Sequence, residues 1–142
     1  MIRIFKENDL TSVMQIWLDT NIKAHNFIPK AYWTDSYATV IKMLPQAEVY
    51  VYEDDSTHQI LGFIGLTGNY IAGIFVKEFV QSNGIGKQLL NYAKMIKTNL
   101  SLSVYQKNVR AVSFYQREQF FIRTENLDDS TNEHEFIMDW RR

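Results

Sequence analysis

Apolar residues in the first third of the chain recur at helical spacing, after a short alternating segment at residues 2–4. One stripe predicts a helix that follows Asn8-Asp9 and fades near His25. It consists of Leu10, Val13, Met14, Trp17 and Leu18. A second helix is expected between Pro29 and Pro45. Its inner stripe is Trp33, Tyr37, Val40, Ile41 and Leu44.

From residue 48 the pattern changes to strands. Apolar runs at 49–52 and 60–66 flank a polar turn and predict a hairpin, and another strand follows at 70–76. A helical pattern then runs to about residue 97, followed by a strand at 100–105, a short helix after Asn108, and strands at 120–125 and 135–140. This order predicts one domain over residues 1–142, a mixed sheet with helices on its faces.

The strand at 70–76 runs into a turn with Gly84 and Gly86 and then into a helix N-terminus. Such a turn can bind an anion, because the first-turn N–H groups have no acceptor within the helix and the helix dipole adds positive charge there. Glycines let phosphates approach the backbone without meeting a Cβ. A helix start with two convenient glycines is the simpler alternative, since glycine-rich loops are weak motifs by themselves.

Two familiar phosphate loops do not fit this stretch. Gln88 follows Lys87 where a Walker loop needs serine or threonine, and Leu89 stands where a dinucleotide fingerprint needs a third glycine. The segment Gln81-Ser-Asn-Gly-Ile-Gly86 instead resembles motif A of the GNAT acetyltransferases, Q/R-x-x-G-x-G/A. In that family the loop holds the pyrophosphate of acetyl-CoA.

A second segment, from Asn108 through Phe114-Tyr115 to Phe120, resembles the family's N-x-x-A-x-x-F-Y-x-x-x-G-F signature, with Gln119 where glycine is usual. The N-terminal half is similar to the small stand-alone bacterial acetyltransferases of the YiaC type. That similarity is carried by residues 16–18, 25–27, 32–33 and 104–108. The resemblance covers nearly the whole chain. It implies the α+β GNAT fold, with a central, mostly antiparallel sheet of about seven strands flanked by about four helices.

The resemblance also implies an acetyl-CoA-dependent N-acetyltransferase that acts on a primary amine. The strand end Ile74-Phe75-Val76 would offer backbone groups to the pantetheine arm. Asn108 would bond to the cofactor arm or cap its own helix. Lys87 would add positive charge at the pyrophosphate, and an ordinary solvated helix lysine is the alternative. The residues expected at the pyrophosphate are Gln81, Ser82, Asn83, Gly84, Ile85, Gly86 and Lys87.

Tyr115 is the candidate general acid, because a phenol with a pKa of about 10 carries at neutral pH the proton that a departing thiolate needs. The alternative is a tyrosine packed beneath the cofactor. Residues 69–76 contain no carboxylate to act as the base. His25 is a candidate base, since its ordinary pKa of about 6.5 suits proton removal. A structural histidine, a water chain or an amine that arrives neutral are the alternatives.

Aromatic residues, with acidic Asp35 nearby in sequence, are expected to form the acceptor groove. The substrate-binding candidates are Phe27, Trp33 and Tyr70. Such a groove suits an amine with an apolar stem, and YiaC-type proteins point to a lysine side chain or N-terminus of a protein or peptide. A small amine or aminoglycoside is the alternative acceptor. An acetyl-CoA-binding sensor without turnover is the alternative function.

The amino-acid composition excludes several classes of function and of binding site. The net charge is −1, so a general attraction to nucleic acid or to an anionic membrane is not expected. The chain has no cysteine, which excludes disulfides, thiolate metal sites and a cysteine nucleophile. We expect no metal site and no membrane segment, and we expect a cytoplasmic monomer or homodimer.

Overall fold

A seven-stranded sheet runs through the computed structural model, which describes residues 1–81 and 83–142. Its spatial order is β1-β2-β3-β4-β5-β7-β6, and every neighbouring pair is antiparallel except β4 and β5. The predicted mixed, mostly antiparallel sheet is therefore confirmed. The strands are β1 (Ile2–Ile4), β2 (Glu48–Glu53), β3 (Ile60–Thr67), β4 (Tyr70–Val76), β5 (Asn99–Tyr105), β6 (Phe121–Asp128) and β7 (Glu133–Arg141).

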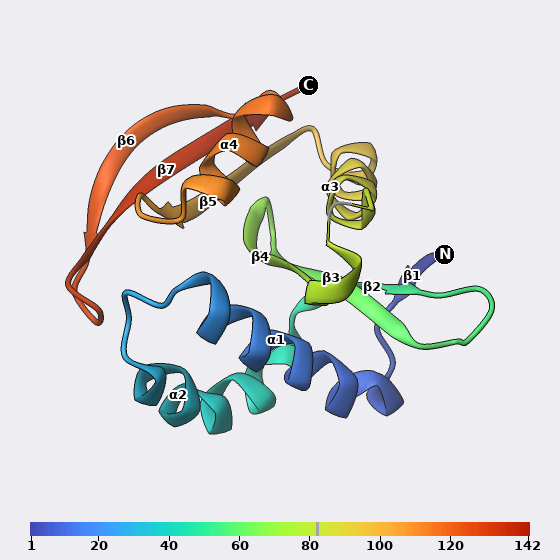
Figure 1. Cartoon of the computed structure of the whole chain (residues 1–142). Helices are drawn as coiled ribbons and strands as arrows, with labels where there is room; N and C mark the ends of the chain where they lie inside the picture. The colour runs from blue at the N-terminus through green and yellow to red at the C-terminus, as the bar shows by residue number, and fades with distance from the viewer. Residues whose placement is uncertain (82) are drawn as a thin grey trace.

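Helices cover both faces of this sheet (Figure 1). The helices α1 (Leu10–Ala24) and α2 (Lys30–Met43) pack on one face, and α3 (Ile85–Ile96) and α4 (Val109–Arg117) on the other. Short 3-10 helices lie at Glu7–Asp9, Leu44–Gln46 and Glu78–Val80. All four α-helices lie where the hydrophobic spacing predicts them.

The strand β3 is buried on both sides and divides the core into two parts. Phe63 packs with the core beneath α1 and α2, whereas Ile64 and Leu66 pack with the core beneath α3. Successive side chains of a strand point to opposite faces, so a nearly continuous apolar run such as 60–66 suits a strand with helices on both sides.

The start of α1 is fixed by an ion pair. Asp9 occupies the N-cap position but makes no side-chain cap bond. Its carboxylate accepts from Arg3 Nη1 and Nη2, at 2.8 and 2.9 Å, and from the backbone N–H of Lys6 at 2.8 Å. The predicted helix start is correct, but the carboxylate connects α1 to β1 instead of capping the helix.

The centre of the sheet is split. Among the described residues, β4 and β5 pair only at Tyr70↔Ser101 and Ile71↔Leu102, and then they diverge. Figure 1 shows the strands β5–β7 turned away from β1–β4 beyond this point. In the part of the chain that the structure describes, one edge of β4 therefore has no partner strand after Ile71. Backbone groups on that side can bind a ligand, apart from the Val76 carbonyl, which accepts from the Gln81 side chain.

Candidate active site

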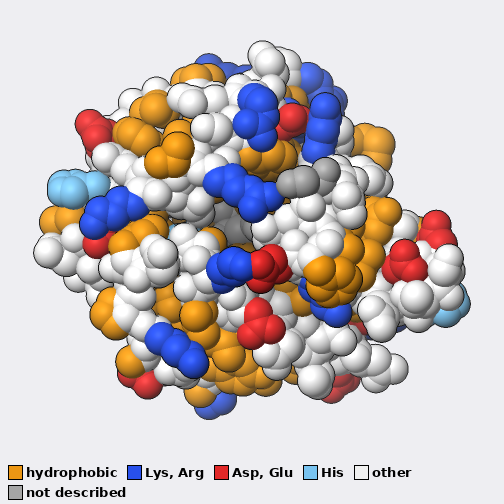
Figure 2. Space-filling model, viewed as in Figure 1, with side chains coloured by type: hydrophobic (Ala, Val, Ile, Leu, Met, Phe, Trp, Pro, Cys, Tyr) orange, Lys and Arg blue, Asp and Glu red, His pale blue; other side chains and the backbone are white. Residues whose placement is uncertain are grey.

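A cleft of about 1450 Å³ opens where the sheet splits, between α1, the end of β4, the first turn of α3 and α4. Figure 2 shows the same face hollowed at its centre, with Lys and Arg side chains around the hollow. The expected site residues that line the cleft are His25, Ile74, Phe75, Val76, Gln81, Gly84, Ile85, Gly86, Lys87, Asn108 and Tyr115. Asn83 is exposed beside the cleft, and Ser82 lies outside the described residues.

The N-terminus of α3 forms one wall of the cleft. Gly84 has φ +82°, in the left-handed region that favours glycine, and its carbonyl accepts the first helical bond from Gln88 N at 3.0 Å. The N–H groups of Ile85, Gly86 and Lys87 consequently have no acceptor within the helix. A Cβ added to Gly86 would meet Val76 and Phe114 at 3.8 Å, which is ordinary contact, so the protein itself does not require glycine there.

Gln81 connects the end of β4 to α4. Its Nε2 donates to the backbone carbonyl of Val76 at 2.9 Å, and its Oε1 accepts from Arg110 Nη1 at 2.9 Å. The side chain therefore shapes the phosphate end of the cleft, in addition to any contact with a ligand.

Basic side chains gather at the same end. Lys87, Arg110 and Arg117 line the cleft, and only Lys87 was predicted to do so. Lys87 Nζ lies 3.9 Å from Glu118 Oε2, a loose ion pair. The two arginines share one face of α4 with Phe114, at positions i, i+4 and i+7, so helical spacing in the sequence was the signal that could have identified them.

Tyr115 lines the cleft from α4. The side chain is 8% exposed, and its hydroxyl makes no hydrogen bond to another described residue. Burial, and secondarily the nearby Tyr70, raises the pKa of Tyr115 above the ordinary value for a phenol. The hydroxyl thus carries its proton at neutral pH.

Asn108 has two partners, and one of them is His25. Asn108 Oδ1 accepts from Ala111 N at 3.3 Å, which confirms the predicted helix cap, while Nδ2 contacts His25 Nε2 at 3.2 Å. Burial lowers the pKa of His25 to about 4, and this outweighs the opposing effect of the Asn21 backbone. His25 is therefore neutral at pH 7, with Nε2 already engaged.

Gly73 and Phe75 shape the β4 side of the cleft. A Cβ on Gly73 would lie 2.4 Å from the Phe75 ring, so the ring covers the bare glycine backbone. The same ring stacks on Phe63 with centroids 4.8 Å apart. Glycine at position 73 is what lets Phe75 lie flat and leave the cleft open.

Polar residues of α1 form the rim opposite α4. Gln15, Asp19 and Lys23 repeat every fourth residue and all line the cleft. Lys23 forms an ion pair with Glu78, which connects α1 to the segment after β4. This rim was not predicted, although the four-residue polar repeat in the sequence indicates it.

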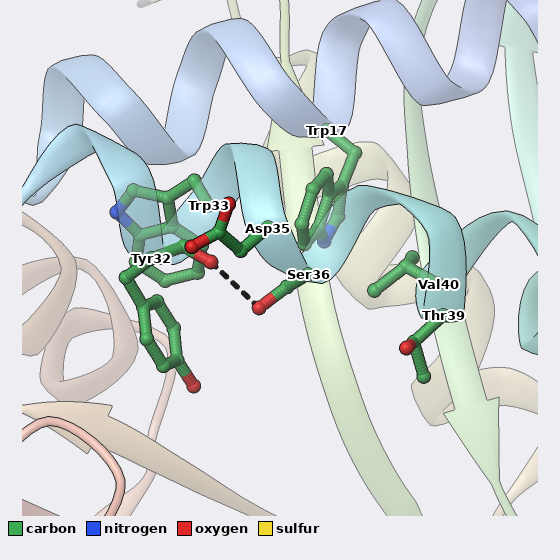
Figure 3. A pocket seen from close by; sticks show the side chains of 7 residues that line it. All are labelled: Trp17, Tyr32, Trp33, Asp35, Ser36, Thr39 and Val40. Carbon is green, nitrogen blue, oxygen red and sulfur yellow. Dashed lines mark hydrogen bonds between the residues drawn. The ribbon is translucent and has the colours of Figure 1, made fainter.

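The three residues expected at the acceptor lie outside the cleft. Trp33 lines a second, shallower hollow of about 430 Å³ beside α2 (Figure 3), together with Trp17, Tyr32, Asp35, Ser36, Thr39 and Val40. In this hollow Ser36 Oγ donates to the Tyr32 carbonyl at 2.7 Å. Phe27 packs against His25 and Tyr105, and Tyr70 is 40% exposed at the start of β4.

Two further properties concern the described residues as a whole. No group of three or more His, Asp or Glu side chains in 1–81 and 83–142 is placed to hold a metal ion. Within the same ranges, every helix is too short or too polar to span a bilayer.

Comparisons with known proteins agree with this geometry. Residues 45–120 match the model of the acetyltransferase (GNAT) domain. The chain is 34% identical over 142 residues to peptidyl-lysine N-acetyltransferase YiaC of Escherichia coli K12, covering 99% of this chain and 96% of that protein.

Solved structures are similar as well. The solution structure of Escherichia coli YjaB superposes with a TM-score of 0.88 at 24% identity, covering 99% of this chain and 96% of that one. An acetyltransferase of Bacillus anthracis, solved in complex with acetyl coenzyme A, superposes with a TM-score of 0.60 at 24% identity over 68% of this chain and 62% of that one.

Proposed function

The chain belongs to the GNAT acetyltransferase family and is an N-acetyltransferase that uses acetyl-CoA, and from this premise we propose that it acetylates lysine side chains of proteins or peptides. One observation carries the proposal. The uncapped N-terminus of α3 and the Tyr115 hydroxyl face one cleft, at the point where β4 leaves its partner strand. An anion site and a candidate proton donor thus line the same groove.

The phosphate end is suited to the pyrophosphate of acetyl-CoA. The N–H groups of Ile85, Gly86 and Lys87 would donate to it, and the positive end of the helix dipole adds to this attraction. Arg110 and Arg117, which line the same end, supply further positive charge. The unpaired edge of β4 at residues 74–76 would bond to the pantetheine arm and so direct the thioester toward Tyr115.

Acetyl transfer then needs one nucleophile and one acid. The neutral amine attacks the thioester carbonyl, a C–N bond forms, and the C–S bond breaks with its electron pair passing to sulfur. Tyr115 would donate its proton to the departing thiolate. The attacking nitrogen releases one proton to solvent, and solvent returns one proton to the Tyr115 phenolate at the end of the cycle. Its raised pKa supports this role, since the phenol stays protonated throughout the neutral range.

His25 is a weak candidate for the base. Its pKa is lowered to about 4 by burial, and Nε2 is engaged with Asn108. An imidazole with so low a pKa is a much weaker base than the lysine amine, whose ordinary pKa is about 10.4. It would therefore give little help in removing a proton from a lysine ammonium. We therefore propose that the amine reaches the thioester in its neutral form, after losing its proton to water.

A lysine acceptor is supported by the relatives and by the surface beside the cleft. YiaC and YjaB are named peptidyl-lysine N-acetyltransferases. The second hollow combines aromatic walls from Trp17 and Trp33 with the carboxylate of Asp35. Aromatic faces and a carboxylate attract basic groups, so a lysine-rich peptide complements this surface.

The test is thiol release from acetyl-CoA with a panel of acceptors. We expect lysine peptides to show the highest kcat/KM, above polyamines and aminoglycosides. The matched control is each peptide with its lysine already acetylated, which should release no thiol. Preference for a small amine would overturn the lysine assignment. Tight binding of acetyl-CoA without turnover on any amine would instead identify a binding module.

A further inference from the structure

We propose that His25 and Asn108 form a clasp that holds α1 against α4 across the split sheet, and that this clasp sets the positions of Tyr115 and the arginines in the cleft. The clasp rests on the proposed function only in taking this cleft as the acetyl-CoA site. It matters because, within the described residues, β4 and β5 pair at just two positions. The two halves of the sheet therefore need other connections to fix the width of the cleft.

The hydrogen-bond partners of Asn108 determine which of its side-chain atoms faces His25 and which group donates. The backbone N–H of Ala111 can only donate, so the Asn108 atom that faces it is the amide oxygen, at 3.3 Å. The amide nitrogen then faces His25 Nε2 at 3.2 Å and donates to it. In this arrangement His25 is a neutral ring that accepts at Nε2 and has its proton on Nδ1, a buried atom with no hydrogen-bond partner among the described residues.

Three aromatic rings hold the His25 side of the clasp in place. The imidazole stacks on Trp33 with centroids 5.3 Å apart and planes 27° apart. Tyr105 and Phe27 meet it edge-on, at 5.1 and 5.7 Å. A ring enclosed on several sides cannot reorient without disturbing its neighbours, so it gives Asn108 a fixed acceptor.

Asn108 connects the position of His25 to the residues of α4 that line the cleft. Asn108 is the N-cap of α4, a helix of nine residues. Five of those residues line the cleft: Arg110, Ala111, Phe114, Tyr115 and Arg117. A shift at the cap would move all of them together. A displacement of about 1 Å at reacting groups can cost as much as 10²-fold in rate.

A catalytic-base role for His25 predicts a different set of results. A base needs a free ring nitrogen that faces the amine, and its loss lowers kcat while cofactor binding is retained. A clasp needs only a hydrogen-bond acceptor at the position of Nε2. Glutamine supplies such an acceptor without basicity, and phenylalanine keeps the ring contacts without the acceptor.

The experiment compares four variants by calorimetry with acetyl-CoA and by steady-state kinetics. His25→Phe removes the acceptor. Asn108→Ser keeps a good helix cap but is too short to reach His25. We expect each to weaken acetyl-CoA binding by about three- to tenfold, the range of one net hydrogen bond. The double variant should be no worse than either single one, because both remove the same contact. His25→Gln should restore affinity to within about twofold.

Several outcomes would overturn the clasp. Additive losses in the double variant would show two independent contacts. Unchanged affinity in folded His25→Phe and Asn108→Ser would show that the bond does not shape the cleft. A His25→Gln variant with normal affinity and a kcat as low as that of His25→Phe would identify a base. Failure of the wild-type protein to acetylate any amine would count against the proposed function alone, because the affinities still test the clasp.

Discussion

The two ends of the cleft are built in different ways. At the phosphate end, the groups available to a ligand are backbone N–H groups of α3, with the basic side chains of Lys87, Arg110 and Arg117 around them. At the other end His25 lines the cleft. Its ring stacks on Trp33, meets Phe27 and Tyr105 edge-on and contacts Asn108, and these three aromatic rings are not themselves part of the cleft lining. The first end is polar and open, whereas the second is aromatic and largely closed.

This difference teaches how each end can recognise its ligand. Backbone N–H groups at a helix start bind any phosphate that fits, and they need glycine more than any particular side chain. An aromatic cluster recognises its ligand through shape and charge, so its specificity depends on which rings and carboxylates face outward. Each prediction below tests whether one end can be damaged without the other.

The largest effect is expected at Tyr115, where the two ends meet. Tyr115→Phe removes the hydroxyl and retains the ring packed against Phe114 and Phe120. Affinity for acetyl-CoA should barely change, while kcat falls by about 10²–10⁴, the usual range for a positioned general acid. Steady-state kinetics and calorimetry measure the two quantities separately.

The pH profile gives an independent check on Tyr115. The required form is the protonated phenol, so the contribution of Tyr115 is fully present at low pH, where protonation of the amine limits activity, and it is lost as pH rises through the pKa of Tyr115 in the folded protein. That pKa is raised by burial, and the alkaline loss should therefore begin above the ordinary phenol value of about 10. A kcat above half the wild-type value for the phenylalanine variant, under conditions where chemistry limits the rate, would remove Tyr115 as the acid.

A smaller but clear effect is expected at the phosphate end. Gly84→Val introduces a β-branched side chain where phosphates would meet the α3 N-terminus. We expect affinity for acetyl-CoA to fall at least tenfold, or about 1.4 kcal/mol, in calorimetry. Binding of a short acetyl thioester that lacks the phosphates should change much less.

Gly68→Val is the matched control. Both glycines have positive φ, +82° and +60°, and a Cβ on either meets nothing within 4 Å. The two substitutions therefore carry similar backbone strain, but only Gly84 lines the cleft. Equal losses of affinity in both variants would mean that strain, and not the phosphate site, explains the effect.

The phosphate end is also where the sequence was most informative. Gly84 specifies local backbone geometry, which depends on a few consecutive residues, and the helix and strand order followed from spacing alone. Arg110 and Arg117 were missed even so, because a helical face must be aligned with a cleft before its charges can be assigned to it. The sequence shows the seven-residue spacing of these arginines, but it does not show which face of the helix borders the cleft.

The aromatic end could not be predicted to the same degree. Phe27, Trp33 and Tyr70 are aromatic residues near the predicted groove, yet none of them lines the cleft. Their positions depend on how α2, β4 and β5 pack, which is a tertiary property that local periodicity does not contain. The bond between His25 and Asn108 joins residues 83 positions apart, and neither segment's own pattern indicates it.

A moderate effect is expected from the arginines at the phosphate end. Replacing Arg110 and Arg117 together with glutamine should weaken acetyl-CoA binding by about three- to tenfold, since exposed charge contacts contribute modestly. Added salt should narrow the gap between this variant and the wild type, because screening weakens the contacts that were removed. Arg123→Gln is the control, since Arg123 lies on the outer strand β6 and pairs with Asp139 of β7. A similar loss for Arg123→Gln would indicate a general effect of net charge.

The smallest effect is expected at Asp35, beside the aromatic end. The Asp35 carboxylate lies in the hollow walled by Trp17 and Trp33, and it is exposed to solvent. An exposed charge contact contributes at most about 1 kcal/mol, so Asp35→Asn should raise KM for a lysine peptide with a second basic residue by about twofold. KM for acetyl-CoA should stay the same, as should KM for a lysine peptide without that residue. Asp55→Asn removes the same charge from the β2–β3 turn, where Asp55 pairs with the N-terminus. If both variants raise KM for the basic peptide equally, net charge explains the effect, and the aromatic end has no separate role in recognising the acceptor.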